Sequence, residues 1–221
     1  MKGQRRRKKA RRVVFALTGF GKFDNVEINP TDVIVKKFPS YLEENPLPFE
    51  AAVDRCLVME VSAEGCKERL SAMHKTCFRD HEDFRVWLHL GVAASKEEFQ
   101  LEQVAWNEAD FRCPDERGWQ PSKQPIFSED GPISQQMKSL LPIRRICSAL
   151  RKNFRVKISC DPGRFVCNWI YYCSLRSCRT EDPEGSDSLF VHVPPFSCIE
   201  EGEQLKFIHN LICQIATNLT S

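Results

Sequence analysis

Five nearly continuous apolar runs are the feature that most restricts how this 221-residue chain can fold. They are rich in β-branched and aromatic residues and end at Gly, Ser or Pro, which is typical of strands covered on both faces. None approaches the length of about 18 apolar residues that a membrane span requires. The pattern therefore predicts five buried strands, at residues 13–20, 56–63, 86–94, 154–160 and 188–195.

Helical patterns alternate with these strands, at residues 30–38, 64–76, 132–152, 165–178 and 200–218. In the last of them, apolar residues recur every three or four positions from Leu205 to Ile215 and form one stripe. Alternation of strands and helices predicts a mostly parallel, twisted sheet with right-handed crossovers and helices on both faces. The expected fold class is α/β, a single three-layer α/β/α domain.

The first 12 residues differ from the rest of the chain in charge. Residues 1–12 carry eight of the 32 Lys and Arg and no acid, so residues 13–221 hold 24 basic and 30 acidic residues, a net charge of −6. We expect a disordered basic leader over 1–12, with a nuclear-type patch or part of an organellar presequence as alternatives. One domain is expected over 13–221. Its acidic charge argues against a nucleic-acid partner.

The eleven cysteines are spaced unlike a metal site. No C-x-x-C pair occurs, and Cys160, Cys167, Cys173 and Cys178 are separated by six, five and four residues. We therefore expect no bound metal and no redox pair. The start of the chain also lacks the apolar segment of a secretory signal, which favours a cytoplasmic location where thiols stay free.

Cys167 is the cysteine whose surroundings favour chemistry. It follows a predicted strand and the turn sequence Asp-Pro-Gly at 161–163. A helix that begins near Phe165 places Cys167 in its first turn, where unpaired N–H groups and the helix dipole favour a thiolate. A helix that begins at Pro162 would place it in the second turn, where this effect is weaker. The other cysteines are expected to be small buried side chains.

A cysteine nucleophile needs a histidine base and a group that orients the histidine. Among the five histidines, His192 lies at the end of the last predicted strand. If the strands at 154–160 and 188–195 are parallel neighbours, their carboxyl ends bring His192 close to Cys167. The remaining histidines are predicted to lie on the solvated surface (His74, His81 and His209) or in the core (His89).

A long polar segment, residues 102–131, interrupts the alternation of strands and helices. Loops of this length inside a compact domain are uncommon and tend to be functional. Glu102 opens the segment, between the apolar residues Leu101 and Val104. Its carboxylate is either exposed or the partner of His192, and the residues alone leave both alternatives open.

Five motifs then stand out together: TGFGKF at 18–23, INPT at 28–31, LEQVAWNEADFRCPDERGWQP at 101–121, SCDPGRFVCNWIYYCSLR at 159–176 and FVHVPPF at 190–196. In this order and spacing the chain resembles the pyroglutamyl peptidase I (pyrrolidone-carboxylate peptidase) family, from about Val13 to the C-terminus. The resemblance is greatest to the plant branch. TGFG and VHVP are weak signals individually, whereas the complete set is specific.

The resemblance implies a hydrolase, a cysteine exopeptidase of the omega-peptidase type. Such an enzyme cleaves the amide bond after an N-terminal pyroglutamate (5-oxoproline) through an acyl-enzyme. The catalytic triad Cys–His–Glu of the family corresponds here to Cys167, His192 and Glu102.

The resemblance also implies that Phe20 and Phe23 pack against the pyroglutamyl ring, and that Arg112 lies on the oxyanion side. Aromatic residues beside a strand are normally core, but these two phenylalanines flank a glycine at a strand end. Lys22 and Gln103 depart from the pattern of many family members.

These departures leave a second function open, that of a catalytically silent relative that binds pyroglutamyl-blocked N-termini without cleaving them. For both functions the expected partner is a peptide with an N-terminal pyroglutamate. No cofactor and no membrane are expected, and assembly into a homo-oligomer stays open.

Overall fold

The computed structural model describes residues 12–23, 28–76, 83–93 and 97–220. Of the predicted leader, only Arg12 is among them, and His81 lies outside them. Within these ranges the strands are β1 (Val13–Phe20), β2 (Ala51–Met59), β3 (Phe84–Val92), β4 (Phe99–Glu102), β5 (Val104–Trp106), β6 (Gln136–Lys138), β7 (Val156–Ser159) and β8 (Ser186–Val193). The helices are α1 (Pro30–Glu44), α2 (Ala63–Thr76), α3 (Ile143–Leu150), α4 (Val166–Glu181) and α5 (Glu201–Thr220), with a 3-10 turn at Ser128–Asp130.

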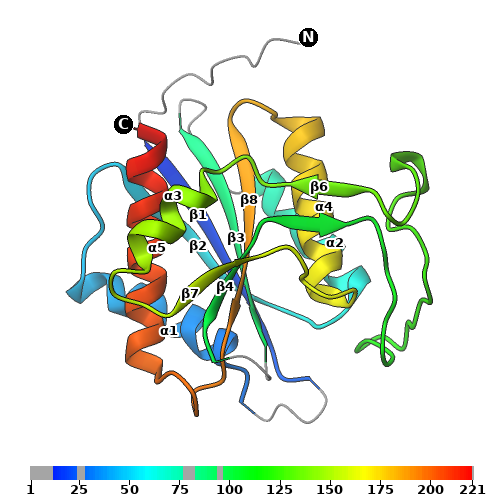
Figure 1. Cartoon of the computed structure of the whole chain (residues 1–221), viewed down its shortest axis with the longest axis horizontal. Coiled ribbons are helices and arrows are strands. Elements are labelled where there is room, and N and C mark those ends of the chain that lie inside the picture. Colours follow the sequence, from blue (N-terminus) through cyan, green and yellow to red (C-terminus); the bar gives the residue numbers. More distant parts are fainter. Residues whose placement is uncertain (1–11, 24–27, 77–82, 94–96, 221) are drawn as a thin grey trace.

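The main sheet has six strands in the order β2-β1-β3-β8-β4-β7 (Figure 1). All its neighbouring pairs are parallel except β4 and β8, which are antiparallel. A separate two-stranded antiparallel sheet joins β5 to β6. The predicted mostly parallel α/β fold is therefore confirmed.

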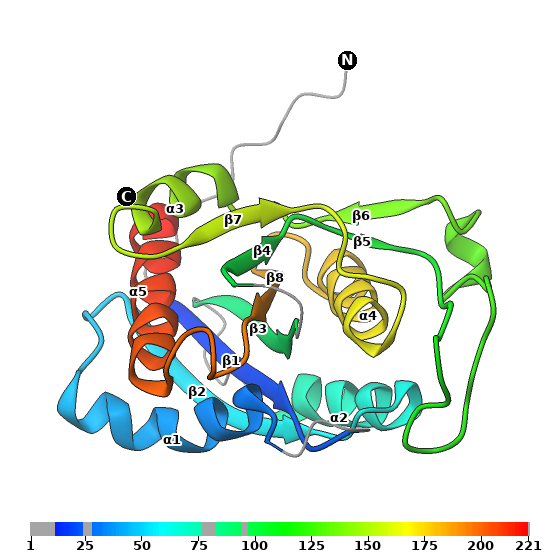
Figure 2. The same cartoon turned by 60° about the horizontal axis from the view of Figure 1, so that its bottom comes forward.

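Helices cover both faces of the main sheet, as Figure 2 shows. Alternate residues of β1 point to opposite faces, as strand geometry requires. Phe15 and Leu17 join a core shared with α1, α3 and α5, whereas Ala16 and Phe20 join a core shared with α2 and α4. Because β1 is buried on both faces, it reads as a continuous apolar run in the sequence.

Three predicted elements differ from the structure by more than three residues at one end or both. The helix expected over 30–38 continues to Glu44, as α1. The helix expected over 132–152 is limited to α3, and residues 136–138 form β6 instead. Pro142 stands at the N-cap of α3, and a proline disfavours helical backbone in the residue before it, so the helix begins only after Pro142. The strand expected over 56–63 runs earlier, as β2, because it pairs with the whole length of β1.

The expectation that the strands at 154–160 and 188–195 are parallel neighbours is wrong. β4 lies between them, antiparallel to β8 and parallel to β7. Its sequence, FQLE, is short and half polar, so no apolar run marked it as a strand. β7 therefore runs antiparallel to β8, and α4, which follows β7 in the chain, still packs against β8.

The long polar segment predicted at 102–131 is held in place by buried polar side chains. Asp115 accepts hydrogen bonds from the backbone N–H groups of Ala63, Arg117 and Trp119. Asn107 is fully buried and bonds to the main chain of Phe127 at both its N–H and its carbonyl. The segment therefore packs as part of the domain, beside α2 and α4 (Figure 2).

Candidate active site

A cavity of about 190 Å³ opens where β1 and β3 end. Open α/β sheets place their ligand sites beyond the carboxyl ends of the strands. The residues that line this cavity come from β1 and the loop after it, the cap of α1, the turn after β2, the end of β3, the long polar segment and the start of α4: Phe20, Phe23, Asn29, Val61, Val92, Arg112, Phe165, Val166 and Cys167. The structure thus brings Cys167 together with all three residues expected to contact substrate.

Cys167 is the second residue of α4, which begins at Val166. This confirms the start near Phe165, and it places the thiol in the first turn, where the helix dipole favours a thiolate. Phe165 provides no side-chain cap for the helix, so the N–H groups of this turn are available to a ligand. The thiol is half-buried at the cavity wall.

Gly91 near the end of β3 makes room for this thiol. A Cβ at this position would lie 3.1 Å from Sγ of Cys167 and 2.7 Å from the ring of Phe190. Real Cβ atoms essentially never approach other atoms as closely as the second distance. Any side chain at Gly91 would therefore push on Phe190 and Cys167 together.

His192 lies near the end of β8 and reaches both Cys167 and Glu102. Its Nδ1 is 2.8 Å from Oε1 of Glu102, and its ring also hydrogen-bonds to the Cys167 thiol. Burial lowers the pKa of His192, but the hydrogen bonds and charges of its two partners outweigh burial and raise the pKa to about 9. An imidazolium at neutral pH stabilises a neighbouring thiolate.

Glu102 is the last residue of β4 and is completely buried. Of the two alternatives for its carboxylate, exposure is therefore wrong. Within the described part of the chain, its Oε2 has no hydrogen-bond partner, so the hydrogen bond of its carboxylate is the one between Oε1 and His192. A buried carboxylate without other donors favours the protonated form of the histidine beside it.

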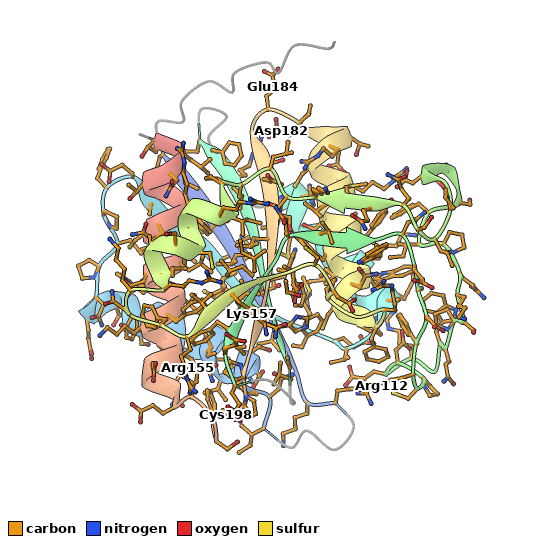
Figure 3. The ribbon with its side chains drawn as sticks, in the orientation of Figure 1. Arg112, Arg155, Lys157, Asp182, Glu184 and Cys198 are labelled. Atoms are coloured by element: carbon orange, nitrogen blue, oxygen red, sulfur yellow. The ribbon has the colours of Figure 1, made fainter. Side chains whose placement is uncertain are left out.

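Aromatic rings form the other wall of the cavity. The Phe23 and Phe165 rings lie 5.4 Å apart between centroids, and Arg112 holds its guanidinium carbon 5.5 Å from the Phe165 ring. Figure 3 shows Arg112 on the long polar segment, near the end of the molecule where β1 ends. Lys22 is exposed and does not line the cavity.

Sequence reasoning missed five residues of the lining: Asn29, Val61, Val92, Phe165 and Val166. Phe165 could have been found, because it stands two residues before Cys167 in the motif GRFVC. Asn29 caps α1 and donates to the carbonyl of Gly21, which fixes the loop between Phe20 and Phe23. Neither Val61 nor Val92 carries a sequence signal beyond its place at a strand end.

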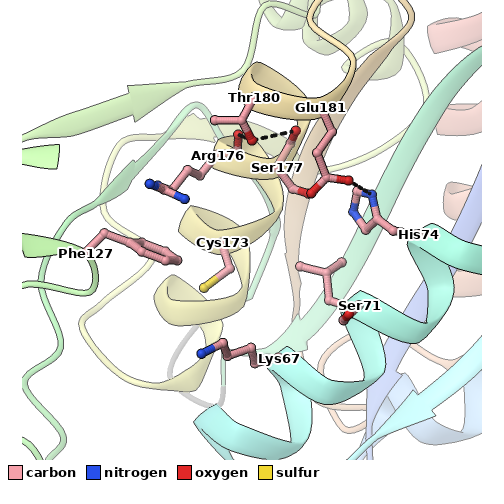
Figure 4. Close-up of a pocket in the computed structure, with 10 residues that line it drawn as sticks. Lys67, Ser71, His74, Phe127, Cys173, Arg176, Ser177, Thr180 and Glu181 are labelled. Carbon is pink, nitrogen blue, oxygen red and sulfur yellow. Dashed lines mark hydrogen bonds and ion pairs between the residues drawn. The ribbon is translucent and has the colours of Figure 1, made fainter. Parts of the chain in front are cut away.

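The surface position predicted for His74 is wrong. Its ring stacks on Trp87 at 4.2 Å between centroids, and its Nδ1 is 3.2 Å from Oε2 of Glu181. This contact lies at a second cavity, of about 370 Å³, between α2 and α4 (Figure 4). The cavity contains none of the predicted site residues. A histidine in a polar helix can still be half-buried when its face of the helix meets a tryptophan.

Two further features bear on metals and membranes. Among the described residues, no group of three or more His, Cys, Asp or Glu side chains could hold a metal ion. Likewise, no helix in these ranges has both the length and the apolar character to cross a membrane.

A thiol, an imidazole and a carboxylate in series, on an α/β sheet, define the general class of cysteine hydrolases. The family model for pyroglutamyl peptidase matches residues 13–205. The chain belongs to this family. Its resemblance to the plant branch stays a prediction.

Individual relatives show the same relationship. The pyrrolidone-carboxylate peptidase of Klebsiella pneumoniae is 32% identical over 181 residues, covering 80% of this chain and 76% of the relative. The crystal structure of pyrrolidone carboxyl peptidase from Fervidobacterium islandicum has a TM-score of 0.78 and 26% identity, over 94% of this chain and 99% of that one. The Thermococcus litoralis structure has a TM-score of 0.75 at 24% identity, covering 93% of both chains, and shows the shared fold.

Proposed function

We propose that this chain is a cysteine exopeptidase that hydrolyses the amide bond after an N-terminal pyroglutamate, with Cys167, His192 and Glu102 as its triad. The observation that carries the proposal is that Cys167 lines an aromatic cavity and bonds to His192, which is 2.8 Å from Glu102. Membership of the pyroglutamyl peptidase family supports the choice of substrate.

In the first step, the thiolate of Cys167 attacks the carbonyl carbon of the pyroglutamyl residue. The imidazolium of His192 then gives its proton to the nitrogen of the departing peptide as the C–N bond breaks. A thioester between pyroglutamate and Cys167 remains, and His192 is neutral. Because its pKa is raised, His192 carries this proton at neutral pH and can donate it.

In the second step, neutral His192 takes a proton from a water molecule, and the resulting hydroxide adds to the thioester carbonyl. The C–S bond breaks, free pyroglutamate leaves, and Cys167 returns to its thiolate next to protonated His192. Glu102 keeps the imidazole in the orientation and tautomer that both steps require.

The first turn of α4 and Arg112 provide the groups for the negative oxygen that forms in each step. The backbone N–H of Cys167 lies in the first turn of α4, where the side chain of the N-cap residue Phe165 accepts no hydrogen bond. Arg112 lies across the same cavity. Removal of one such donor commonly reduces kcat about 10²–10³-fold.

The cavity suits a neutral, flat lactam. Phe20, Phe23 and Phe165 provide apolar surface for the five-membered ring, and Val61 and Val92 complete it. A free α-ammonium group would lose its hydration in such a site without gaining a partner. The cavity therefore selects a blocked N-terminus.

The surroundings of the enzyme are part of the proposal. We infer a cytoplasmic location, supported by the ten described cysteines, all of which are free thiols. Fractionation of cells that express the tagged chain tests this location. Assembly into a homo-oligomer stays a prediction, which sedimentation of the purified chain tests.

Hydrolysis of a fluorogenic pyroglutamyl amide under reducing conditions tests the activity, with Cys167→Ala and His192→Ala measured in parallel. Turnover by the parent chain and none by either variant is the expected result. A folded parent chain that binds the amide but never cleaves it would favour the catalytically silent relative instead.

A further inference from the structure

Two buried side chains of α4 hydrogen-bond to the main chain of the segment that begins with Glu102. Oδ1 of Asn168 accepts from the backbone N–H of Trp106 at 2.8 Å. Nδ2 of Asn168 donates to the carbonyls of Trp106 at 2.9 Å and Glu108 at 2.8 Å. The hydroxyl of Tyr171, one helical turn later, donates to the carbonyl of Glu102 at 2.7 Å. Both side chains are completely buried.

One of these four bonds joins α4 to β4, which carries the Glu102 carboxylate, and the other three join α4 to β5 and Glu108, a few residues further along the same segment. Asn168 directly follows Cys167, and the carbonyl that Tyr171 holds belongs to Glu102 itself. Between its first and last turns a helix uses its own N–H and C=O groups internally, so side chains mainly fix its position against a neighbouring strand. Apolar packing alone would let α4 slide along β4 and β5, whereas directed hydrogen bonds set one register.

We propose that Asn168 and Tyr171 are positioning residues that set the distance from the Cys167 thiol to the His192–Glu102 pair. This inference rests on the triad of the proposed function. Neither residue lines the cavity, so neither is expected to contact substrate. Their loss would misplace the reacting groups, and a misplacement of about 1 Å can cost about 100-fold in rate.

The chain contains a matched control for Asn168. Asn107 is also a completely buried asparagine, and its side-chain amide also makes three hydrogen bonds to the main chain. Its partners are Phe127 and Gly131, within the long polar segment, and none of these bonds reaches α4. Asn107→Ala therefore removes the same chemistry at the same burial without releasing the helix of Cys167.

The experiment compares the parent chain with Asn168→Ala, Tyr171→Phe and Asn107→Ala. Two properties are measured: kcat and KM for a fluorogenic pyroglutamyl amide, and the rate at which Cys167 is alkylated by iodoacetamide as a function of pH. Thermal unfolding of each variant is recorded in parallel.

We expect Asn168→Ala to lower kcat about 100-fold and Tyr171→Phe about tenfold, with KM changed less than about threefold. The alkylation profile of both variants should move toward that of an ordinary thiol, because the imidazolium no longer lies within reach of the sulfur. Asn107→Ala should lose a similar amount of thermal stability yet keep kcat and the alkylation profile of the parent.

Equal effects of Asn168→Ala and Asn107→Ala on kcat and on alkylation would overturn the proposal, because a general loss of stability would then explain both. If Asn168→Ala does not fold, Asn168→Asp decides the question with Tyr171→Phe. The aspartate keeps the shape of the side chain, but its carboxylate cannot donate to the two carbonyls that Asn168 binds. An unchanged alkylation profile would again overturn the proposal. A parent chain without turnover would refute the proposed function alone, since alkylation needs only the thiol and the imidazole.

Discussion

Two buried histidines lie on neighbouring strands of the sheet and have opposite properties. His192 on β8 bonds to Glu102 and Cys167, and its pKa is raised to about 9. Among the described residues, His89 on β3 hydrogen-bonds only to the Thr18 hydroxyl, through Nδ1 at 2.7 Å, and burial lowers its pKa to about 3. Both rings lie near Phe190, with centroids 4.9 Å and 6.4 Å away.

The comparison shows that burial alone does not make a histidine reactive. Burial disfavours the charged form of both rings. The Glu102 carboxylate and the Cys167 sulfur face the ring of His192 and raise its pKa in spite of burial. His89 meets a hydroxyl instead, and burial lowers its pKa. The difference between the proposed base and the core residue therefore lies in the partners, which come from other strands and helices.

The largest expected difference between the two histidines is in catalysis. His192→Ala should lower kcat for a pyroglutamyl amide on the order of 10⁴-fold or more, as loss of a triad base does. His89→Leu should leave kcat within about threefold, because the neutral ring only fills the core. Steady-state kinetics of both purified variants measure this, and equal losses in the two would contradict the distinction.

Removal of the Glu102 carboxylate should lower the pKa of His192 toward that of His89. Glu102→Gln keeps the shape of the side chain but removes its charge, so the pKa of His192 falls and kcat drops on the order of 10²–10⁴-fold. The alkaline limb of the pH–rate profile should move to lower pH. If the alkaline limb of the variant does not move, Cys167 alone is responsible for the raised pKa of His192.

The two histidines should also give opposite dependences of stability on pH. The folded pKa of His192 lies above its unfolded value of about 6.5, so its contribution is complete below pH 6.5 and is lost as pH rises through about 9. The folded pKa of His89 lies below 6.5, so its contribution is complete above pH 6.5 and is lost as pH falls toward about 3.

Urea denaturation across this pH range measures both effects as changes in the free energy of unfolding. His192→Gln should flatten the alkaline side of the curve, and His89→Leu the acidic side. If either variant flattens the opposite side, the assigned directions are wrong.

The smallest expected effect concerns the hydrogen bond between His89 and Thr18. Thr18→Val removes the hydroxyl partner of Nδ1 and should lower the free energy of unfolding by about 1 kcal/mol. Activity should not change, since neither residue lines the cavity. Urea denaturation and steady-state kinetics of the variant check the two statements, and a large loss of kcat would give His89 a role in the site.

Much of the fold, and part of the site, could be predicted from the sequence. The strand at 13–20 has the predicted bounds, because a strand that is buried on both faces consists of an uninterrupted run of apolar residues. The position of Cys167 in the first turn of α4 followed from the Asp-Pro-Gly turn before it. His89 was predicted to lie in the core because of its position in the middle of a strand, and in the structure it is completely buried.

The rest depends on tertiary contacts that leave no local pattern. β4 is four residues long and places two polar side chains in the interior, so it has neither an apolar run nor an alternation to mark it. The burial of Glu102 follows from that strand, which the sequence did not predict. The stacking of His74 on Trp87 joins a polar helix to a strand far away in sequence. The role of Phe165 was overlooked, although the motif contains it.

The most direct test of the proposed mechanism is to trap the acyl-enzyme. The parent chain is mixed with a pyroglutamyl amide, quenched in acid within one turnover and digested, and the cysteine-containing peptides are analysed by mass spectrometry. The account predicts a pyroglutamyl thioester on the peptide that contains Cys167, and on none of the other ten cysteines. Turnover with the adduct on a different cysteine, or with no thioester at any time, would contradict it.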